Sequence, residues 1–134
     1  MTKSIGVVIL LFAVACSGQQ ACPAVALPPE YGAHGFVIPP GGRLCRAVPL
    51  VDDAPSRGQR GELTIDFANK SVEEVKAIVR SSMAASGWDP IQGAEEGRYV
   101  HGNGQAWTNA FVDVRGPLSG RPTEAYVSIS THHQ

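Results

Sequence analysis

The chain has 134 residues, of which 43% are hydrophobic, and this is enough for one domain with a single hydrophobic core. Its formal net charge is −1, from 11 basic and 12 acidic residues that form no dense basic run. This balance argues against nucleic acid as a partner, because a protein that binds nucleic acid needs a basic surface.

The first fifteen residues have the pattern of an export signal. Lys3 precedes an apolar segment, residues 5–14. About ten apolar residues are too few to cross a bilayer as a helix, which takes about 20. They have the length and the flanks of a secretory signal peptide. We therefore predict that residues 1–15 are a signal peptide and that the protein is exported.

The end of this signal fits two kinds of cleavage site. Ala13-Val14-Ala15 satisfies the small-x-small rule of ordinary signal cleavage. The same residues followed by Cys16 resemble the lipobox of bacterial lipoproteins. That resemblance implies a lipidated Cys16 with two or more acyl chains, which anchor a protein stably to a membrane. Ser17 after the cysteine resembles the outer-membrane rather than the inner-membrane sorting pattern.

The cysteine count bears on the oxidation state. Three cysteines in an exported protein leave one unpaired if the other two form a disulfide. Lipidation of Cys16 would leave Cys22 and Cys45 as partners, and the compartment outside the cytoplasm is oxidising. The alternative makes one of these two a nucleophile with His34 as its base, but no surrounding motif supports it.

The first half of the chain changes composition at residue 43. Residues 16–42 are rich in proline and glycine and show no sustained periodicity, which predicts a tether. Residues 43–134 are expected to form the folded domain. Within it, residues 43–50 alternate as an edge strand, residues 51–61 have a loop composition, and residues 62–67 alternate as a strand with one apolar face.

One helix is predicted, beginning at Ser71 and ending near Gly87. Ser71 precedes Glu74 by three residues, the capping-box spacing, and Gly87 suits a left-handed helix end. The apolar residues recur at steps of three and four: Val72, Val75, Ile78, Val79 and Met83. Trp88 follows the helix and is expected to anchor its end in the core.

The second half of the chain has the pattern of β-strands. Residues 98–102 and 105–116 flank Asn103-Gly104, a dipeptide that favours hairpin turns, and residues 125–131 alternate as a final strand. The predicted fold class is α+β: one antiparallel sheet of about four or five strands with a single helix packed on one face.

The pattern resembles a recurrent kind of small bacterial lipoprotein domain. The matching pieces are "IPPGGRLC", "LTIDFANKSVEEVKAIV", "SGWDP" and "AFVDVRG" with "AYVSIS", within residues 38–131. The resemblance implies the α+β fold and attachment to the membrane through the N-terminal lipid. It brings no catalytic residue with it.

The sequence offers little for catalysis or metal binding. It has no G-x-S-x-G elbow and no phosphate-binding glycine loop. His101 and His132 could meet across neighbouring strands, but a third metal ligand is not evident. We predict no catalytic residue, no metal and no cofactor. The alternative is an exported enzyme or metal-binding protein that uses cysteine or histidine.

The strand pattern places aromatic residues together. If the small residues of 106–114 face the helix, Trp107 and Phe111 face away from it, and so does Tyr126 of the last strand. An exposed apolar patch of this kind often marks a binding surface. The alternative is that these rings are core or are covered by another segment. On the first interpretation the protein is a non-catalytic binding or structural module with an envelope protein or glycan as partner.

Overall fold

The computed structural model describes residues 22–53, 58–103, 106–118 and 120–133, and within the strands it leaves the side chains of 103, 106, 107 and 133 undescribed. These residues form one antiparallel sheet with the strand order β1-β2-β6-β5-β4-β3. The strands are β1 (Arg43–Asp53), β2 (Gly58–Phe67), β3 (Asp89–Pro90), β4 (Arg98–Asn103), β5 (Ala106–Arg115) and β6 (Thr123–His133). The helices are α1 (Pro29–Ala33) and α2 (Val72–Ala85).

The antiparallel α+β prediction is confirmed, but the sheet has six strands instead of four or five. The extra strand is β3, which follows the helix and was not among the predicted strands. Asp89 pairs with Val100 and Pro90 pairs with Tyr99 of β4. A two-residue strand has no periodicity of its own, so only its partner strand reveals it.

Much of the predicted loop at residues 51–61 is strand. β1 continues to Asp53 and β2 begins at Gly58, and the two strands pair as far as these two residues. A Cβ atom on Gly58 would lie 1.7 Å from the carbonyl oxygen of Thr131 in β6. The glycine therefore permits close strand approach, whereas in the sequence it resembles a loop signal.

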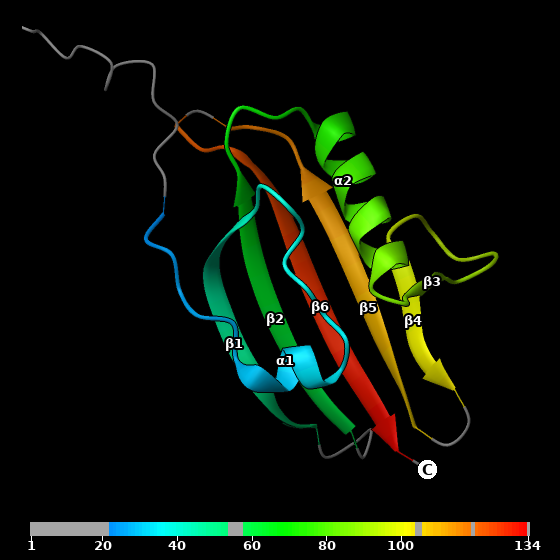
Figure 1. Ribbon diagram of the computed structural model, residues 1–134. Helices are drawn as coiled ribbons and strands as arrows, with labels where there is room; N and C mark the ends of the chain where they lie inside the picture. The colour runs from blue at the N-terminus through cyan, green and yellow to red at the C-terminus, as the bar shows by residue number, and fades with distance from the viewer. Residues whose placement is uncertain (1–21, 54–57, 104–105, 119, 134) are drawn as a thin grey trace, which may run out of the picture.

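The inner face of the sheet forms the core, as the alternation in residues 62–67 predicts. Leu63 pairs with Val127, and Ile65 pairs with Ala125, with all four side chains buried. Figure 1 shows α1, the chain that follows it and α2 lying over this one face of the sheet.

The predicted helix is confirmed in both its ends. The Ser71 side chain accepts a hydrogen bond from the Glu74 amide, and the Glu74 carboxylate accepts one from the Ser71 amide. After the last helical turn, Gly87 has a φ of 86°, and the Trp88 amide donates to the Met83 carbonyl. This is the Schellman arrangement that a glycine in this position predicts.

The prediction of a single helix is wrong, because α1 forms within the proline-rich segment. Tyr31 of α1 is fully buried, and its hydroxyl donates to the carbonyl oxygen of Val48 in β1. Phe36, just after α1, is also part of the core. Residues 22–42, which by composition resemble a tether, thus pack against the sheet as far as the structure describes them.

Gly61 of β2 makes room for this helix. A Cβ atom at Gly61 would lie 2.1 Å from the Tyr31 hydroxyl oxygen. Burial, with smaller contributions from Glu30 and Glu62, raises the pKa of Tyr31 to about 12. The phenol therefore stays protonated and keeps its hydrogen bond to β1 over the whole ordinary pH range.

Trp88 is a core anchor, as its position after the helix predicts. Its side chain is 1% exposed, its Nε1 donates to the Gly35 carbonyl oxygen over 3.0 Å, and its ring lies 5.1 Å from that of His101. It thereby connects the end of α2 to the segment after α1 and to β4.

The predicted signal peptide and Cys16 lie outside the described residues. Among the residues that are described, no helix has the length and apolar character needed to cross a membrane.

Candidate functional site

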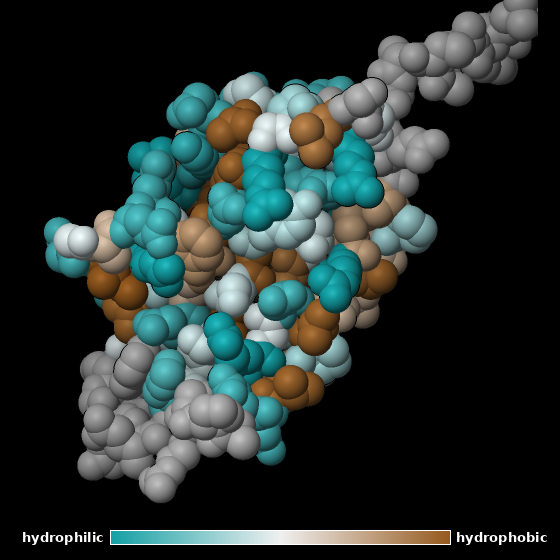
Figure 2. Space-filling model, turned by 180° about the vertical axis from the view of Figure 1, so that it is seen from behind, coloured by the Kyte–Doolittle hydropathy of each residue, from teal (hydrophilic) through white to brown (hydrophobic). Residues whose placement is uncertain are grey.

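The candidate site is the face of the sheet opposite α1 and α2, which we call the outer face. Strand pairing places Phe111 beside Ser128 and Arg98, and Tyr126 beside Thr64 and Asp113. Figure 2 shows the molecule from behind, where hydrophilic side chains predominate and apolar ones lie in small patches between them. The described helices leave this face uncovered (Figure 1).

The first ring on the outer face belongs to Phe111 of β5. The guanidinium carbon of Arg98 lies 4.6 Å from the centre of this ring, within cation–π range. The same guanidinium donates from Nε and Nη2 to one carboxylate oxygen of Glu95, over 3.0 and 2.7 Å. Arg98 is therefore held over the ring by two interactions while its side chain remains half exposed.

The second ring belongs to Tyr126 of β6 and repeats this arrangement. The Arg115 guanidinium lies 4.6 Å from the ring centre, and its Nε donates to Asp113 over 3.0 Å. The Tyr126 hydroxyl donates to Glu124. This hydrogen bond is the main reason that the pKa of Tyr126 is raised, with burial as a second cause.

A shallow hollow of about 210 Å³ lies between the two ring systems. Its wall includes the side chains of five residues from four strands: Arg46 of β1, Glu62 of β2, Phe111 and Asp113 of β5, and Tyr126 of β6. Arg46 and Glu62 are 3.9 Å apart and both are about two-thirds exposed, so water screens their attraction strongly. The hollow thus offers two aromatic rings together with charged groups of both signs.

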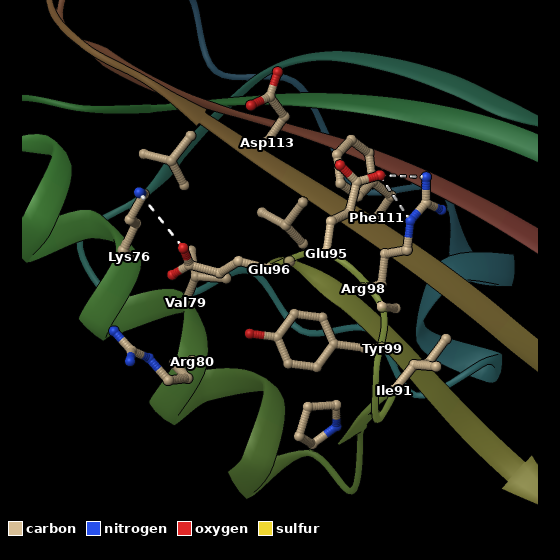
Figure 3. Close-up of a pocket in the computed structure, with 15 residues that line it drawn as sticks. Lys76, Val79, Arg80, Ile91, Glu95, Glu96, Arg98, Tyr99, Phe111 and Asp113 are labelled. Carbon is tan, nitrogen blue, oxygen red and sulfur yellow. Dashed lines mark hydrogen bonds and ion pairs between the residues drawn. The ribbon is translucent and has the colours of Figure 1, made fainter.

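A second hollow of about 370 Å³, the edge pocket, lies between α2, β5 and the chain that leads into β4. Phe111 and Asp113 line both hollows, so the outer face continues around this edge. In Figure 3, Val79 and Tyr99 lie in the interior of the pocket while charged side chains surround it. Lys76 of α2 and Glu96 of the connecting chain form an ion pair of 3.7 Å across it.

Phe111 and Tyr126 are two of the three rings predicted to share a face, and the prediction did not include their charged partners. Phe111 and Tyr126 lie on the same face of neighbouring strands and are half-buried. The Trp107 backbone pairs with Gly102 and His132, but its side chain lies outside the described residues. Arg98 and Arg115 were not singled out; arginines on the same strand faces as the rings were the only signal for them.

The first alternative to a non-catalytic module is a cysteine nucleophile with His34 as its base. Cys22 and Cys45 form a disulfide with a Cα–Cα distance of 5.5 Å, so neither is a free nucleophile in this state. The Nδ1 atom of His34 lies 3.2 Å from the Thr108 hydroxyl of β5, whereas Cys45 is in the edge strand β1. Within the described part of the chain, the structure therefore does not bring His34 and a cysteine together as a catalytic pair.

No set of metal ligands centred on histidine is found among the described residues. His101 packs against Trp88 on the inner side, whereas His132 follows the inward-facing Thr131 and so belongs to the opposite side of β6. The one close group of cysteine, histidine and acidic side chains in the described ranges is Cys22, Cys45 and Asp66. Its two sulfur atoms are bonded to each other.

Comparisons of the chain with protein-family models, with curated proteins and with solved structures find no match.

Proposed function

We propose that this protein is a lipid-anchored module of the bacterial cell envelope that binds another envelope protein through the outer face, a face that carries no catalytic residue. The observation that carries the proposal is the sheet face without a helix, on which two arginine–aromatic pairs flank a hollow. Tyrosine, tryptophan and arginine are the residue types that most often dominate the binding energy of protein interfaces.

The charges of the outer face favour a protein as the partner. Arg46, Arg98 and Arg115 alternate with acidic groups, chiefly Glu62 and Asp113. A surface of mixed sign complements another mixed surface and gives no net attraction to a polyanion such as nucleic acid or an anionic membrane. A glycan would need mainly ring stacking and hydrogen bonds, and it is the alternative outcome of the test below.

The proposed location in the cell envelope is inferred from the N-terminal sequence. A short apolar signal and the Ala13-Val14-Ala15-Cys16 pattern support export and lipidation, with the outer membrane favoured over the inner by Ser17. The disulfide between Cys22 and Cys45 fits an oxidising compartment. Lipidation of Cys16 would also account for the cysteine that has no partner in this pair.

The anchor can be tested with Cys16→Ser. We expect this substitution to abolish incorporation of radiolabelled fatty acid and to move the protein from the membrane fraction to the soluble fraction. The reason is that a chain without its acyl groups loses the hydrocarbon burial that holds it. Cys16→Ser protein that stays with the membranes would contradict the anchor, and the protein with Cys16 intact is the matched control.

The binding surface can be tested by photo-crosslinking in intact cells. A photoreactive residue in place of Ser128 would lie on the outer face between the rings. One in place of Ser81 would lie on the solvent-exposed side of α2, on the other side of the sheet. We expect a discrete protein adduct from position 128 and none from position 81. Phe111→Ala with Tyr126→Ala should reduce that adduct by about tenfold or more, because truncating interface anchors costs at least 1–2 kcal/mol each.

The control for the photo-crosslinking experiment is Val37→Ala, which truncates an apolar side chain that is 55% exposed on the helix side of the sheet. It should leave the adduct unchanged. Equal adducts from positions 81 and 128 would refute the outer face as the binding surface. An adduct that glycosidases remove and proteases do not would refute the protein partner.

A further inference from the structure

A buried carboxyl group lies beside the disulfide. Asp66 is in β2 on the outer face, yet it is only 8% exposed, because the disulfide and the chain around Pro122 cover it. Its Oδ1 is the one buried side-chain nitrogen or oxygen without a hydrogen-bond partner among the described residues. A buried and unsatisfied carboxyl group is costly, so a protein that retains one suggests a use for it.

The geometry places this carboxyl group within reach of both sulfur atoms. A carboxylate oxygen of Asp66, the Sγ of Cys22 and the Sγ of Cys45 all lie within 4.8 Å of one another. A hollow of about 370 Å³ is lined by Cys22, Cys45, Asp66 and Arg121. Both cysteines are partly exposed and share the lining of this hollow with Asp66, so the hollow is where an external thiol would meet the disulfide.

The surroundings favour the neutral form of Asp66. Burial raises the pKa of Asp66, and the charge of Glu124 on β6 raises it further. Arg121, in the chain before β6, and Arg43 of β1 oppose this increase. These are the charged groups that face Asp66 from the neighbouring elements, and burial outweighs the two arginines.

We propose that Cys22–Cys45 is a redox-active disulfide that exchanges with external thiols, with Asp66 giving a proton to the sulfur that leaves and regaining a proton from the second external thiol. Low-molecular-weight thiols and protein dithiols are the class of substrate. The site is separate from the outer-face hollow and from the lipid anchor, so the proposal does not depend on the proposed function.

The proposed exchange takes two steps. An external thiolate attacks one sulfur of Cys22–Cys45, which forms a mixed disulfide and releases the other sulfur as a thiolate. Neutral Asp66 donates its proton to that thiolate and becomes a carboxylate. A second external thiol gives its proton to Asp66, and the resulting thiolate attacks the mixed disulfide. The products are one external disulfide and two cysteines, with two electrons transferred to the protein; the last released thiolate takes its proton from water.

Opening the disulfide would change how the N-terminal segment is attached. Cys22 and Val25 lie along the free edge of β1, where the Val25 amide donates to the Leu44 carbonyl oxygen and Arg43 donates to the Cys22 carbonyl oxygen. After reduction such hydrogen bonds would hold residues 22–25 to the edge strand without the covalent bond, whereas the buried Tyr31 and Phe36 would still hold the chain that follows. The redox state would therefore control the attachment of the chain that precedes the domain.

The test measures the reduction of the folded, exported protein by reduced glutathione between about pH 4 and about pH 8. Thiols are trapped with an alkylating reagent, and each rate is divided by the glutathione thiolate concentration at that pH. We expect this corrected rate to fall by about tenfold as Asp66 ionises, because the carboxylate has no proton to donate and repels both thiolates. In Asp66→Asn the corrected rate should be nearly independent of pH.

Glu124→Gln is the matched control, because it removes the neighbouring charge and leaves Asp66 in place. Since Glu124 raises the pKa of Asp66, the fall in rate should persist in this variant and move to lower pH. Asp66→Asn should fold at least as stably as the native chain at pH 7. A carboxyl group with a raised folded-state pKa contributes stability at acid pH that is lost as the pH rises through that value, and asparagine does not undergo this loss.

A corrected rate in the native protein that does not change with pH would overturn the proposal. The same fall in Asp66→Asn as in the native protein would also overturn it. So would a disulfide that glutathione reduces only after the chain has been unfolded, because the site must react in the folded state.

Discussion

Replacing Trp88 with alanine should lower the free energy of unfolding by about 3–5 kcal/mol, the range for removing a fully buried aromatic side chain. The residue is 1% exposed, and its removal would leave a cavity where α2 ends above β4. It would also leave the Gly35 carbonyl oxygen without the hydrogen bond from Nε1. Both losses fall on the point that joins α2 to the segment after α1.

The measurement is urea unfolding followed by circular dichroism, since the substitution removes one of only two tryptophans and makes fluorescence unsuitable. Trp88→Phe is the matched control, because it keeps most of the apolar volume and removes the hydrogen bond, so its loss should be clearly smaller. Limited proteolysis should also cut Trp88→Ala faster around residues 34–42, which Trp88 helps to hold. A loss under about 1 kcal/mol would contradict the role of Trp88 as a core anchor.

Local signals in the sequence predicted α2 well. Its first turn is set by the Ser71–Glu74 capping box and its end by Gly87 with Trp88, and each of these motifs acts within six residues. Strict alternation in the same way assigned Leu63 to the inner face and Phe111 to the outer face. These features depend on neighbours in the chain, so the sequence could reveal them.

The features that the sequence analysis missed depend on distant neighbours. Tyr31 anchors α1 because the backbone at Val48 accepts its hydrogen bond and Gly61 leaves space for its hydroxyl group. No local pattern around α1 contains that information, so the proline-rich composition dominated the prediction. The pair of Arg98 with Phe111 likewise exists only through the register of β4 on β5.

The burial of Asp66 likewise could not be predicted from its neighbours in the chain. Leu63, Ile65 and Phe67 mark the inner face of β2, so alternation assigns Asp66 to the outer face, where a carboxylate is expected to be solvated. It is buried because Cys22, 44 residues away in the chain, is bonded to Cys45 above it. The chemistry of the site thus arises from the disulfide and the strand together.

Replacing both cysteines of the pair, Cys22→Ser with Cys45→Ser, should destabilise the domain by about 3 kcal/mol. The bond joins residues separated by 23 positions, and a closed loop of that length restricts the unfolded chain by about this amount. The unfolded variant should be more expanded, so its unfolding should depend more steeply on urea concentration. Cys16 must stay intact in this experiment to keep the N-terminus unchanged.

This loss should depend on pH in a direction that the burial of Asp66 sets. The disulfide helps to bury Asp66, and burial raises its pKa in the folded protein. The raised pKa lowers stability above that pKa and has no effect well below the ordinary value for aspartate. Because the double variant leaves Asp66 better solvated, it escapes part of that penalty at neutral pH.

The double substitution should therefore destabilise the domain less at pH 7 than at about pH 3, where Asp66 is neutral in both proteins. Urea unfolding at the two values measures this difference, and the triple variant that adds Asp66→Asn provides the control. Compared with Asp66→Asn alone, the triple variant should lose the same free energy at both values. A larger loss at pH 7 than at about pH 3 for the double substitution would mean that the disulfide does not govern the burial of Asp66.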